Sequence, residues 1–380
     1  MRKRRSSSVK KSAILRLPAL LLTAAILLSL AACAEPIALS YGKTEVSQSL
    51  YEYWYSSYKN YYLIVFDGEN SPEYFAEVLD EETGLTVGEF YDRQIRGVIE
   101  SNAASLYYFE KLGLSLTESR LREIDEQLNS EIENAGGRAA LNEILGRMHG
   151  NTDTLRDAIE AEEKIAALYS YLFGDSEQGI PGSVTVSEEE KETFYSKRYV
   201  CVRQILLRTK EKNVVGEDGY ALLDEDGNVL TEPMTAEETA AKYALRDEIL
   251  QELEAGADFA ELMEKYNEDS SEKTYDKGYL IASFSGFDAA LTKTAQSLAI
   301  GEVGTCETSV GIHILIRDEL PEKPWNDSIY QTMLQNFDSS LQNAWYDAMI
   351  EDVLSSLRRN DSATEEIRIE NADISFWNQN

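Results

Sequence analysis

The sequence is poor in the residues that bind metals or form disulfides. Only two histidines and three cysteines occur among 380 residues, and no Cys-x-x-Cys pair is present. Zinc sites need several such ligands at close spacing, so neither a metal nor another cofactor is expected. Cys201 and Cys306 could form a disulfide or remain buried thiols, and the sequence leaves both alternatives open.

Positive charge is also scarce over most of the chain. The 36 Lys and Arg residues face 68 Asp and Glu residues, which gives a formal net charge of -32. Such a surface repels the phosphates of nucleic acid and an anionic bilayer, so nucleic acid is excluded as a partner. The apolar fraction of 43% and the aromatic fraction of 10% are still high enough to build the cores of two or three domains.

The first 32 residues differ from the rest in charge and hydropathy. They carry seven positive charges and no acid, and they end in sixteen mostly apolar residues from Leu17 to Ala32. This stretch is short for a membrane-spanning helix, which needs roughly 20 apolar residues, and is typical of a secretory signal peptide. A plain spanning anchor is the alternative interpretation.

The expected signal peptide ends in Leu30-Ala31-Ala32-Cys33, which resembles the lipobox of bacterial lipoproteins. The resemblance implies that Cys33 receives a lipid and becomes the first residue of the mature chain. The protein would then be extracytoplasmic and held to the bacterial cell membrane by a lipid anchor.

The segment after the signal peptide has the apolar spacing of helices. Ile95, Val98, Ile99, Leu106 and Phe109 recur mostly every three or four residues, and similar patterns continue to Leu172. The region from about 45 to 173 is therefore expected to be almost entirely helical. Eight aromatic residues between 51 and 66 are interpreted as helix-packing surface, with a binding platform as the alternative.

A change of pattern after residue 186 indicates a second domain. Ser187 and Glu190 form one capping box, and Thr235 and Glu238 form a second. The residues 199–207 and 311–316 have the composition of strands. Two Asp-Gly turns in the segment 208–234 predict a β-hairpin insert. After Pro321 and Pro324, an apolar stripe predicts a long helix from about Asn326 to Arg359.

Three ordered segments of this second region resemble the parvulin-type peptidyl-prolyl isomerase domain. They are Gly256–Leu262 with Tyr266–Ser270, then Ser297–Val303, then Gly311–Leu315. With the helical segments on both sides, the order of elements resembles the extracytoplasmic foldases of the PrsA and SurA type.

The resemblance implies an α+β fold. A helical SurA-N-like chaperone module would contain an inserted parvulin-like domain, in which helices flank a small antiparallel sheet, and a C-terminal helix would return to the helical module. The expected boundaries are 1–32 for the signal peptide, 33–186 for the helical N-terminal module, 187–320 for the parvulin-type domain with its insert at 208–234, and 321–380 for the C-terminal helix and tail.

The resemblance also implies a set of site residues. Gln204, Asp269 and His313 would form the polar catalytic set, and Leu280, Phe287 and Leu291 would line an apolar pocket for the proline ring. The sequence departs from the family at Gln204, where active members usually carry His, and at Lys277–Ile281, where a Gly-Gly-Asp-Leu-Gly turn is usual. Because Gln does not titrate near neutral pH, these departures predict weakened catalysis.

Three functions are compatible with these patterns. The first is a membrane-anchored foldase with prolyl isomerase activity, whose partners are unfolded or partly folded exported polypeptides and their X-Pro segments. The second is an inactive holdase chaperone of the same architecture. The third is a solute-binding lipoprotein, but the repeated β-α-β units of that class are missing. The evenly spread acidic charge is interpreted as a solvating surface with some attraction for basic unfolded clients.

Overall fold

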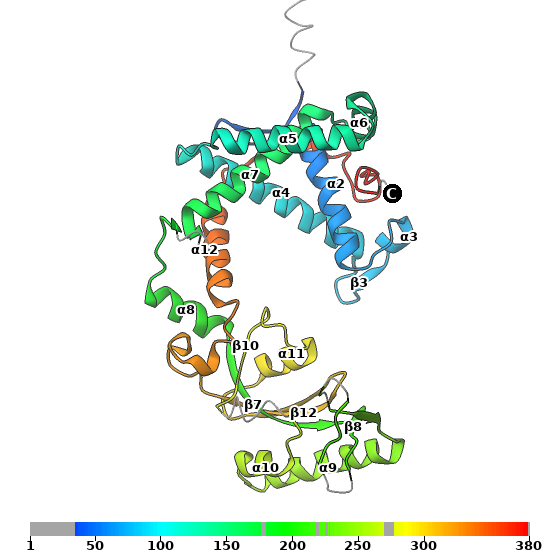
Figure 1. Cartoon of the computed structure of the whole chain (residues 1–380), viewed down its shortest axis with the longest axis vertical. Coiled ribbons are helices and arrows are strands. Elements are labelled where there is room, and N and C mark those ends of the chain that lie inside the picture. The colour runs from blue at the N-terminus through cyan, green and yellow to red at the C-terminus, as the bar shows by residue number, and fades with distance from the viewer. Residues whose placement is uncertain are drawn as a thin grey trace, which may run out of the picture. The chain divides into compact units, whose positions relative to one another are not determined.

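The computed structural model shows a mixed α+β protein that divides into two compact units (Figure 1). One unit contains the described residues up to Val184 and those from Tyr346 onward, and the other spans Thr185–Trp345. The structure describes residues 35–175, 180–216, 220–224, 227, 229–269 and 277–378. The expected signal peptide and Cys33 lie outside these residues. Among the described helices, none combines the length and the apolar run needed to cross a membrane.

Three helices, α2, α4 and α7, form the centre of the first unit, and each begins at a residue that caps it. Ser47 caps α2 (Gln48–Val65), Thr86 caps α4 (Val87–Lys111) and Asn151 caps α7 (Thr152–Phe173) through side-chain oxygens that accept backbone N–H groups. The expectation of a largely helical segment is confirmed. The shorter helices of the segment are α3 (Pro72–Phe75), α5 (Glu118–Asn134), α6 (Arg138–Leu145) and the 3-10 turn η1 (Gly146–Met148).

The aromatic residues of α2 have two different environments. Tyr51, Tyr53, Trp54 and Tyr55 are buried, which confirms the interpretation of this half of the helix as packing surface. At the other end of α2, Tyr61 and the C-cap residue Phe66 are exposed.

Short strands are present in this unit where the sequence patterns predicted none. β1 (Ile37–Tyr41) pairs with β2 (Thr44–Ser47) on one edge and with β13 (Arg358–Arg359) on the other. The pairing joins Leu39 to Arg359 across almost the whole sequence. Two further hairpins are β3 (Val78–Asp80) with β4 (Leu85–Thr86) and β5 (Gly174–Asp175) with β6 (Ile180–Pro181).

The C-terminal part of the chain packs on this helical unit, as the resemblance implied. From Tyr346 onward, α12 (Phe337–Leu354) belongs to it: the Tyr346 hydroxyl donates to Ser105 at 2.7 Å, and the Tyr108 hydroxyl donates to the Met349 carbonyl at 3.0 Å. The last short helix, α13 (Asp361–Thr364), follows β13.

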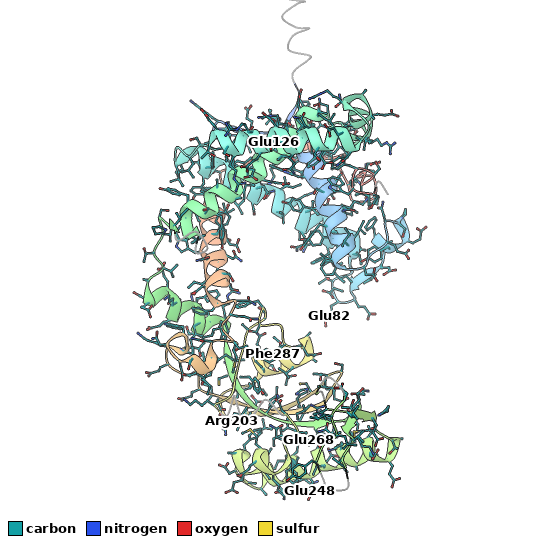
Figure 2. The ribbon with its side chains drawn as sticks, viewed as in Figure 1. Glu82, Glu126, Arg203, Glu248, Glu268 and Phe287 are labelled. Carbon is teal, nitrogen blue, oxygen red and sulfur yellow. The ribbon has the colours of Figure 1, made fainter. Side chains whose placement is uncertain are left out.

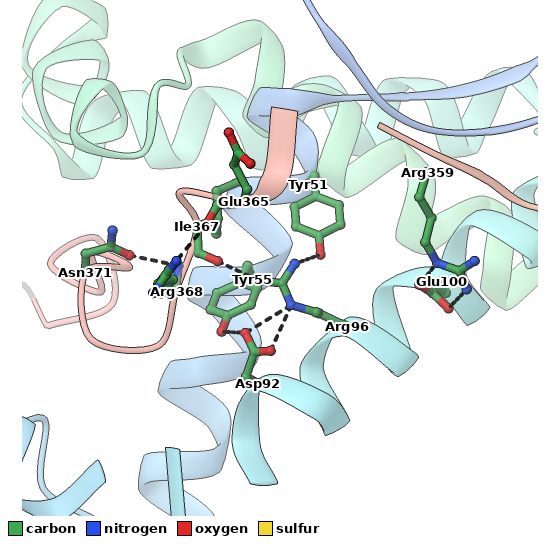
Figure 3. A network of polar contacts seen from close by, with 10 residues as sticks. All are labelled: Tyr51, Tyr55, Asp92, Arg96, Glu100, Arg359, Glu365, Ile367, Arg368 and Asn371. Carbon is green, nitrogen blue, oxygen red and sulfur yellow. Dashed lines mark hydrogen bonds and ion pairs between the residues drawn. The ribbon is translucent and has the colours of Figure 1, made fainter. Parts of the chain in front are cut away.

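Arg96 on α4 ties the tail to the helices (Figure 3). Its guanidinium donates to both carboxylate oxygens of Asp92, to the Tyr51 hydroxyl at 2.9 Å and to the Ile367 carbonyl at 2.6 Å. The Tyr55 hydroxyl also donates to Asp92, at 2.5 Å. Because the guanidinium presents five donors in a fixed plane, one side chain can hold α2, α4 and the tail together.

A four-stranded antiparallel sheet forms the centre of the second unit, in the order β10-β7-β12-β11. The strands are β7 (Val200–Arg208), β10 (Tyr279–Ile281), β11 (Val303–Glu307) and β12 (Gly311–Asp318). On one face, Ile205 and Ile314 pack with residues of α9 (Ala236–Glu254) and α10 (Phe259–Tyr266). On the other face, Val202 and Leu315 pack with residues of α11 (Ala289–Ser297).

The remaining elements lie at the margins of this sheet unit. α8 (Glu188–Arg198) begins at the capping box that Ser187 and Glu190 were expected to form. In the insert, β8 (Glu211–Asn213) pairs with β9 (Thr231–Pro233), and Leu223 bridges Val229, which confirms the predicted hairpin.

The long C-terminal helix starts later than the sequence pattern predicted. Residues 324–336 form two 3-10 turns, η2 (Pro324–Asn326) and η3 (Ser328–Tyr330), and a further turn before α12 begins at Phe337. Lys323 has a φ of 46°, and the Asp327 side chain accepts the Ile329 N–H. A regular helix is therefore interrupted at two points, one at Lys323 and one at Asp327. The apolar side chains of this segment therefore belong to a cluster with α8 and β7 rather than to a helical stripe.

Candidate functional site

Gln204 and His313 lie on the same face of the sheet, the face that packs with α11. Antiparallel register places His313 of β12 opposite Leu206 and Leu315 opposite Gln204 of β7, so Gln204 and His313 are diagonal neighbours. Diagonal pairs on one face are within reach of long side chains. The His313 Nδ1 atom lies 2.8 Å from Gln204 Oε1, and His313 is only 4% exposed.

Asp269 reaches the same point from the loop that follows α10. β10 pairs with β7 only as far as Val202, and farther along the strand the loop occupies this edge. The Leu206 N–H donates to Asn267 Oδ1 at 2.8 Å, and the Glu268 N–H donates to the Leu206 carbonyl at 2.9 Å. These two bonds fix the loop so that Asp269 Oδ2 accepts a hydrogen bond from Gln204 Nε2 at 2.6 Å. The structure thus brings the three expected polar residues together.

The direction of every hydrogen bond in this set follows from Asp269. An ionised carboxylate only accepts, so the Gln204 atom beside it is the amide nitrogen, and the amide oxygen faces His313. His313 therefore carries its proton on Nδ1, and its Nε2 accepts from Thr308 Oγ1, which lies 2.9 Å away. Hydrogen bonds therefore run in one direction: Thr308 donates to His313, His313 donates to Gln204, and Gln204 donates to the Asp269 carboxylate. We call this series the donor chain.

Two members of the set carry no signal in the sequence patterns. The Tyr279 hydroxyl of β10 donates to Asp269 Oδ2 at 2.6 Å, and Thr308 lies in the turn between β11 and β12. The turn that contains Tyr279 lacks the Asp that the resemblance implies, and only the register of β10 on β7 reveals that Tyr279 reaches Asp269.

The polar set forms one side of a pocket of about 360 Å³. Phe287, labelled in Figure 2, and Leu291 line it, as the resemblance implied. The other lining residues are Val202, Gln204, Leu206, Asp269, Tyr279, Ile281, Gly286, Asp288, Thr308, Ser309, Val310 and His313. Apolar walls beside a few convergent polar groups are typical of a small binding site.

Leu280 does not line this pocket, which corrects the sequence-based expectation. Successive residues of a strand point to opposite faces of the sheet, and Tyr279 and Ile281 line the pocket. Leu280 is fully buried on the other side, in a cluster with Phe194, Tyr199 and Phe337. The pocket wall at β10 is therefore Tyr279 and Ile281.

The described residues that line the pocket include two carboxylates, Asp269 and Asp288, and no Lys or Arg. Burial lowers the pKa of His313 below its ordinary value of 6.5, against the opposing effect of Asp269 and Asp288. Neutral His313 is the form that can accept from Thr308 while donating to Gln204. Within the described ranges, no group of three or more His, Cys, Asp or Glu could hold a metal ion.

We expect acid to weaken this site through His313. The unfolded chain binds the histidine proton at a higher pH than the folded chain, so the stability from this group is present above pH 6.5 and is lost as the pH falls through the lower folded value. Denaturant unfolding of the wild type and His313→Gln between pH 7.5 and 5 measures this difference. The wild type should lose more stability than the variant, and parallel curves would contradict the assignment.

Both described cysteines are free thiols rather than a disulfide. Burial raises the pKa of Cys201 to about 12, and burial also raises the pKa of Cys306. A thiol with a raised pKa is a poor nucleophile, and neither cysteine lines the pocket.

Comparisons with known proteins place a family domain over this site. The sequence model of the PPIC-type PPIASE domain matches residues 188–319. No curated protein gives a significant match.

Three solved structures of foldases are similar to the chain. PrsA from Bacillus subtilis is 18% identical, with 74% of this chain and 93% of that chain covered and a TM-score of 0.24. PrsA from Bacillus cereus is 17% identical, with 77% and 97% covered and a TM-score of 0.27. PrsA from Streptococcus pneumoniae is 15% identical, with 74% and 94% covered and a TM-score of 0.23.

Proposed function

Because residues 188–319 form a PPIC-type peptidyl-prolyl isomerase domain, we propose that the chain is an extracytoplasmic foldase that isomerises X-Pro bonds in exported polypeptides. The observation that carries the proposal is the pocket within that domain, where Gln204, Asp269 and His313 form one hydrogen-bonded set beside Phe287 and Leu291. The prediction of a parvulin-type domain is confirmed by the family match.

The pocket has the chemistry that this reaction needs. Isomerisation crosses a barrier of about 18–20 kcal/mol that comes from amide resonance, and no bond is made or broken. The site must therefore hold the proline ring and favour the twisted amide over the planar one. Phe287 and Leu291 offer an apolar wall for the ring, and the polar set offers oriented dipoles beside it. Since no proton is transferred, a neutral His313 and a non-titrating Gln204 are compatible with catalysis.

We expect the catalysis to be weaker than that of a parvulin with His at position 204. Gln204 fills the gap between His313 and Asp269, but it supplies an amide where the family usually supplies a second imidazole. The inactive holdase is the competing function that this substitution favours. Under that alternative, the purified protein would delay aggregation of an unfolded client without accelerating cis–trans exchange of a proline peptide.

Replacing Gln204 by His should raise kcat/KM for an X-Pro peptide by about tenfold, which corresponds to ~1.4 kcal/mol of transition-state stabilisation. A histidine there could donate to Asp269 from one ring nitrogen and accept from His313 with the other, so both hydrogen bonds would be kept. A peptide isomerisation assay measures the change. An unchanged rate in a folded variant would place the defect elsewhere in the pocket.

We also propose that a lipid on Cys33 anchors the protein to the outer side of the bacterial cell membrane. The support is the cationic leader, the apolar stretch and the lipobox-like Leu30–Cys33. Cys33→Ala should leave the protein unprocessed or release it into the medium, which fractionation and mass spectrometry detect. A cleaved Cys33→Ala product that stays in the membrane fraction would overturn the anchor.

A further inference from the structure

The C-terminal end of α2 exposes an apolar surface that the fold does not cover. Tyr61, Ile64 and Val65 share one side of the helix at spacings of three and four, and Phe66 follows them as the C-cap. Their exposed fractions are 57%, 71%, 52% and 53% in that order. We call these four residues the α2-end surface. Scattered exposed apolar residues are ordinary, but four within six positions form a patch that indicates a binding site.

Phe66 joins this surface to an aromatic cluster. The rings of Tyr62 and Phe66 are stacked with centroids 5.9 Å apart, and both lie within 5.9 Å of the ring of Tyr91 on α4. The Tyr74 and Tyr91 hydroxyls are 3.0 Å apart and hydrogen-bonded. Because these contacts already order Phe66, its ring loses little freedom when a ligand packs on it.

The stretch of sequence that carries this surface is mainly acidic, with Lys59 and Arg93 at its two ends. Residues 60–92 contain nine Asp or Glu residues and no Lys or Arg. Glu77 and Glu81 flank β3, whose Val78 and Leu79 are also exposed, and Glu82 follows in the turn of the β3–β4 hairpin (Figure 2). The stretch that carries the α2-end surface therefore combines exposed apolar residues with an excess of carboxylates.

These features select one kind of partner. An anionic membrane and nucleic acid are repelled by these carboxylates, and a second copy of the chain would bring two acidic segments together. A polypeptide segment with apolar side chains and nearby Lys or Arg would bind favourably to both the apolar and the acidic residues. Its apolar side chains can pack on the α2-end surface, and its cations can pair with the carboxylates or lie over the aromatic rings.

We propose that the α2-end surface binds apolar, basic segments of unfolded polypeptides, separately from the proline pocket. The inference rests on the proposed function, because it names the clients and a second binding site of the same foldase. It assigns a role to Tyr61 and Phe66, the exposed aromatic residues of a segment whose first half is packing surface.

The direct test is binding of a fluorescent, proline-free peptide of alternating leucine and lysine, followed by fluorescence anisotropy. Ile64→Ser/Val65→Ser should raise Kd by about tenfold, since two apolar contacts are lost from the patch. The matched control is Leu112→Ser/Ile300→Ser, which changes two exposed aliphatic residues elsewhere and should stay within about twofold. Equal losses in both pairs would overturn the proposal.

Charge is tested with the same peptide. Glu77→Lys/Glu81→Lys should weaken binding at low salt, and the effect should shrink at high salt because counterions screen it. Glu254→Lys/Glu264→Lys reverses two exposed acids on α9 and α10 and is the control. A peptide with glutamate in place of lysine should bind at least about tenfold more weakly to the wild type. Equal binding of the two peptides would contradict the charge argument.

Other occupants give different results. Loss of a dimer on Ile64→Ser/Val65→Ser in analytical ultracentrifugation would identify a self-interface, and loss of flotation with zwitterionic vesicles would identify a lipid surface; either would overturn the proposal. Isomerisation of a short X-Pro peptide should be unchanged in this variant. If the wild type isomerises the X-Pro peptide but does not bind the leucine-lysine peptide, the proposed isomerase activity stands and the second binding site is wrong. If it binds the leucine-lysine peptide without isomerising the X-Pro peptide, the second binding site stands and the isomerase activity is wrong.

Discussion

Replacing Asp269 by alanine should lower kcat/KM for an X-Pro peptide by about 100-fold, the scale found when an oriented electrostatic group is removed from an active site. Asp269 accepts from both Gln204 and Tyr279, and its charge sets the direction of the whole donor chain. Without the carboxylate, the Gln204 amide can rotate and His313 loses its fixed tautomer. The loss should be mainly in kcat, because the apolar wall that binds the proline ring is kept.

The control for this prediction is Asp247→Ala, which removes an exposed acid of α9 that pairs with Arg246. It should retain full activity, because surface ion pairs contribute little. Thermal unfolding of both variants shows whether each is folded. An Asp269→Ala protein that is folded and within about threefold of the wild type would remove Asp269 from the catalytic set.

Ile205→Ala should destabilise the sheet unit by about 3 kcal/mol, within the range for emptying a buried aliphatic site. Ile205 is fully buried between the sheet and the helices α9 and α10. It is adjacent to Gln204 in sequence, but it points to the opposite face of β7. The folded fraction of this variant should therefore keep its kcat/KM, even though its denaturant midpoint falls.

The kcat/KM and the denaturant midpoint of Ile205→Ala together test which face of β7 carries Ile205 and which carries Gln204. Ile316→Ala, at a half-buried position of the same cluster, is the matched control and should cost about 1 kcal/mol, because less apolar surface is buried there. Loss of activity without loss of stability in Ile205→Ala would mean that Ile205, rather than Gln204, faces the pocket.

Local patterns in the sequence were sufficient for the elements that depend on short-range signals. Capping boxes at Ser187 and Thr235 mark the starts of α8 and α9, and the alternation in 199–207 and 311–316 predicts the two central strands. The resemblance then supplied Gln204, Asp269 and His313 as a set, and the register of β7 on β12 explains why the first and last of these meet.

The patterns failed where distant residues decide the structure. The pairing of Leu39 with Arg359 depends on the folded helical unit and has no local signal. The same holds for Tyr279, which reaches Asp269 only because β10 pairs with β7, and for Leu280, which that pairing turns away from the pocket. In the segment 324–336, side chains that fit a helical stripe are instead used for packing against α8 and β7.

Under the proposed function, the pocket has separate residues for binding the proline ring and for electrostatic stabilisation. Phe287 and Leu291 provide apolar surface that either a catalyst or a holdase could use. Under the proposed function, the hydrogen-bonded set from Thr308 to Asp269 would favour the twisted amide over the planar one, and the isomerase and holdase alternatives differ in that role.

Two-dimensional NMR exchange spectroscopy on an X-Pro peptide tests the central claim most directly. With catalytic amounts of the purified protein, exchange peaks between the cis and trans forms should appear at mixing times far shorter than the tens of seconds of the uncatalysed reaction. They should disappear with Asp269→Ala. Peptide resonances that shift or broaden on binding to the wild type, while no exchange peaks appear, would contradict the isomerase and leave the holdase.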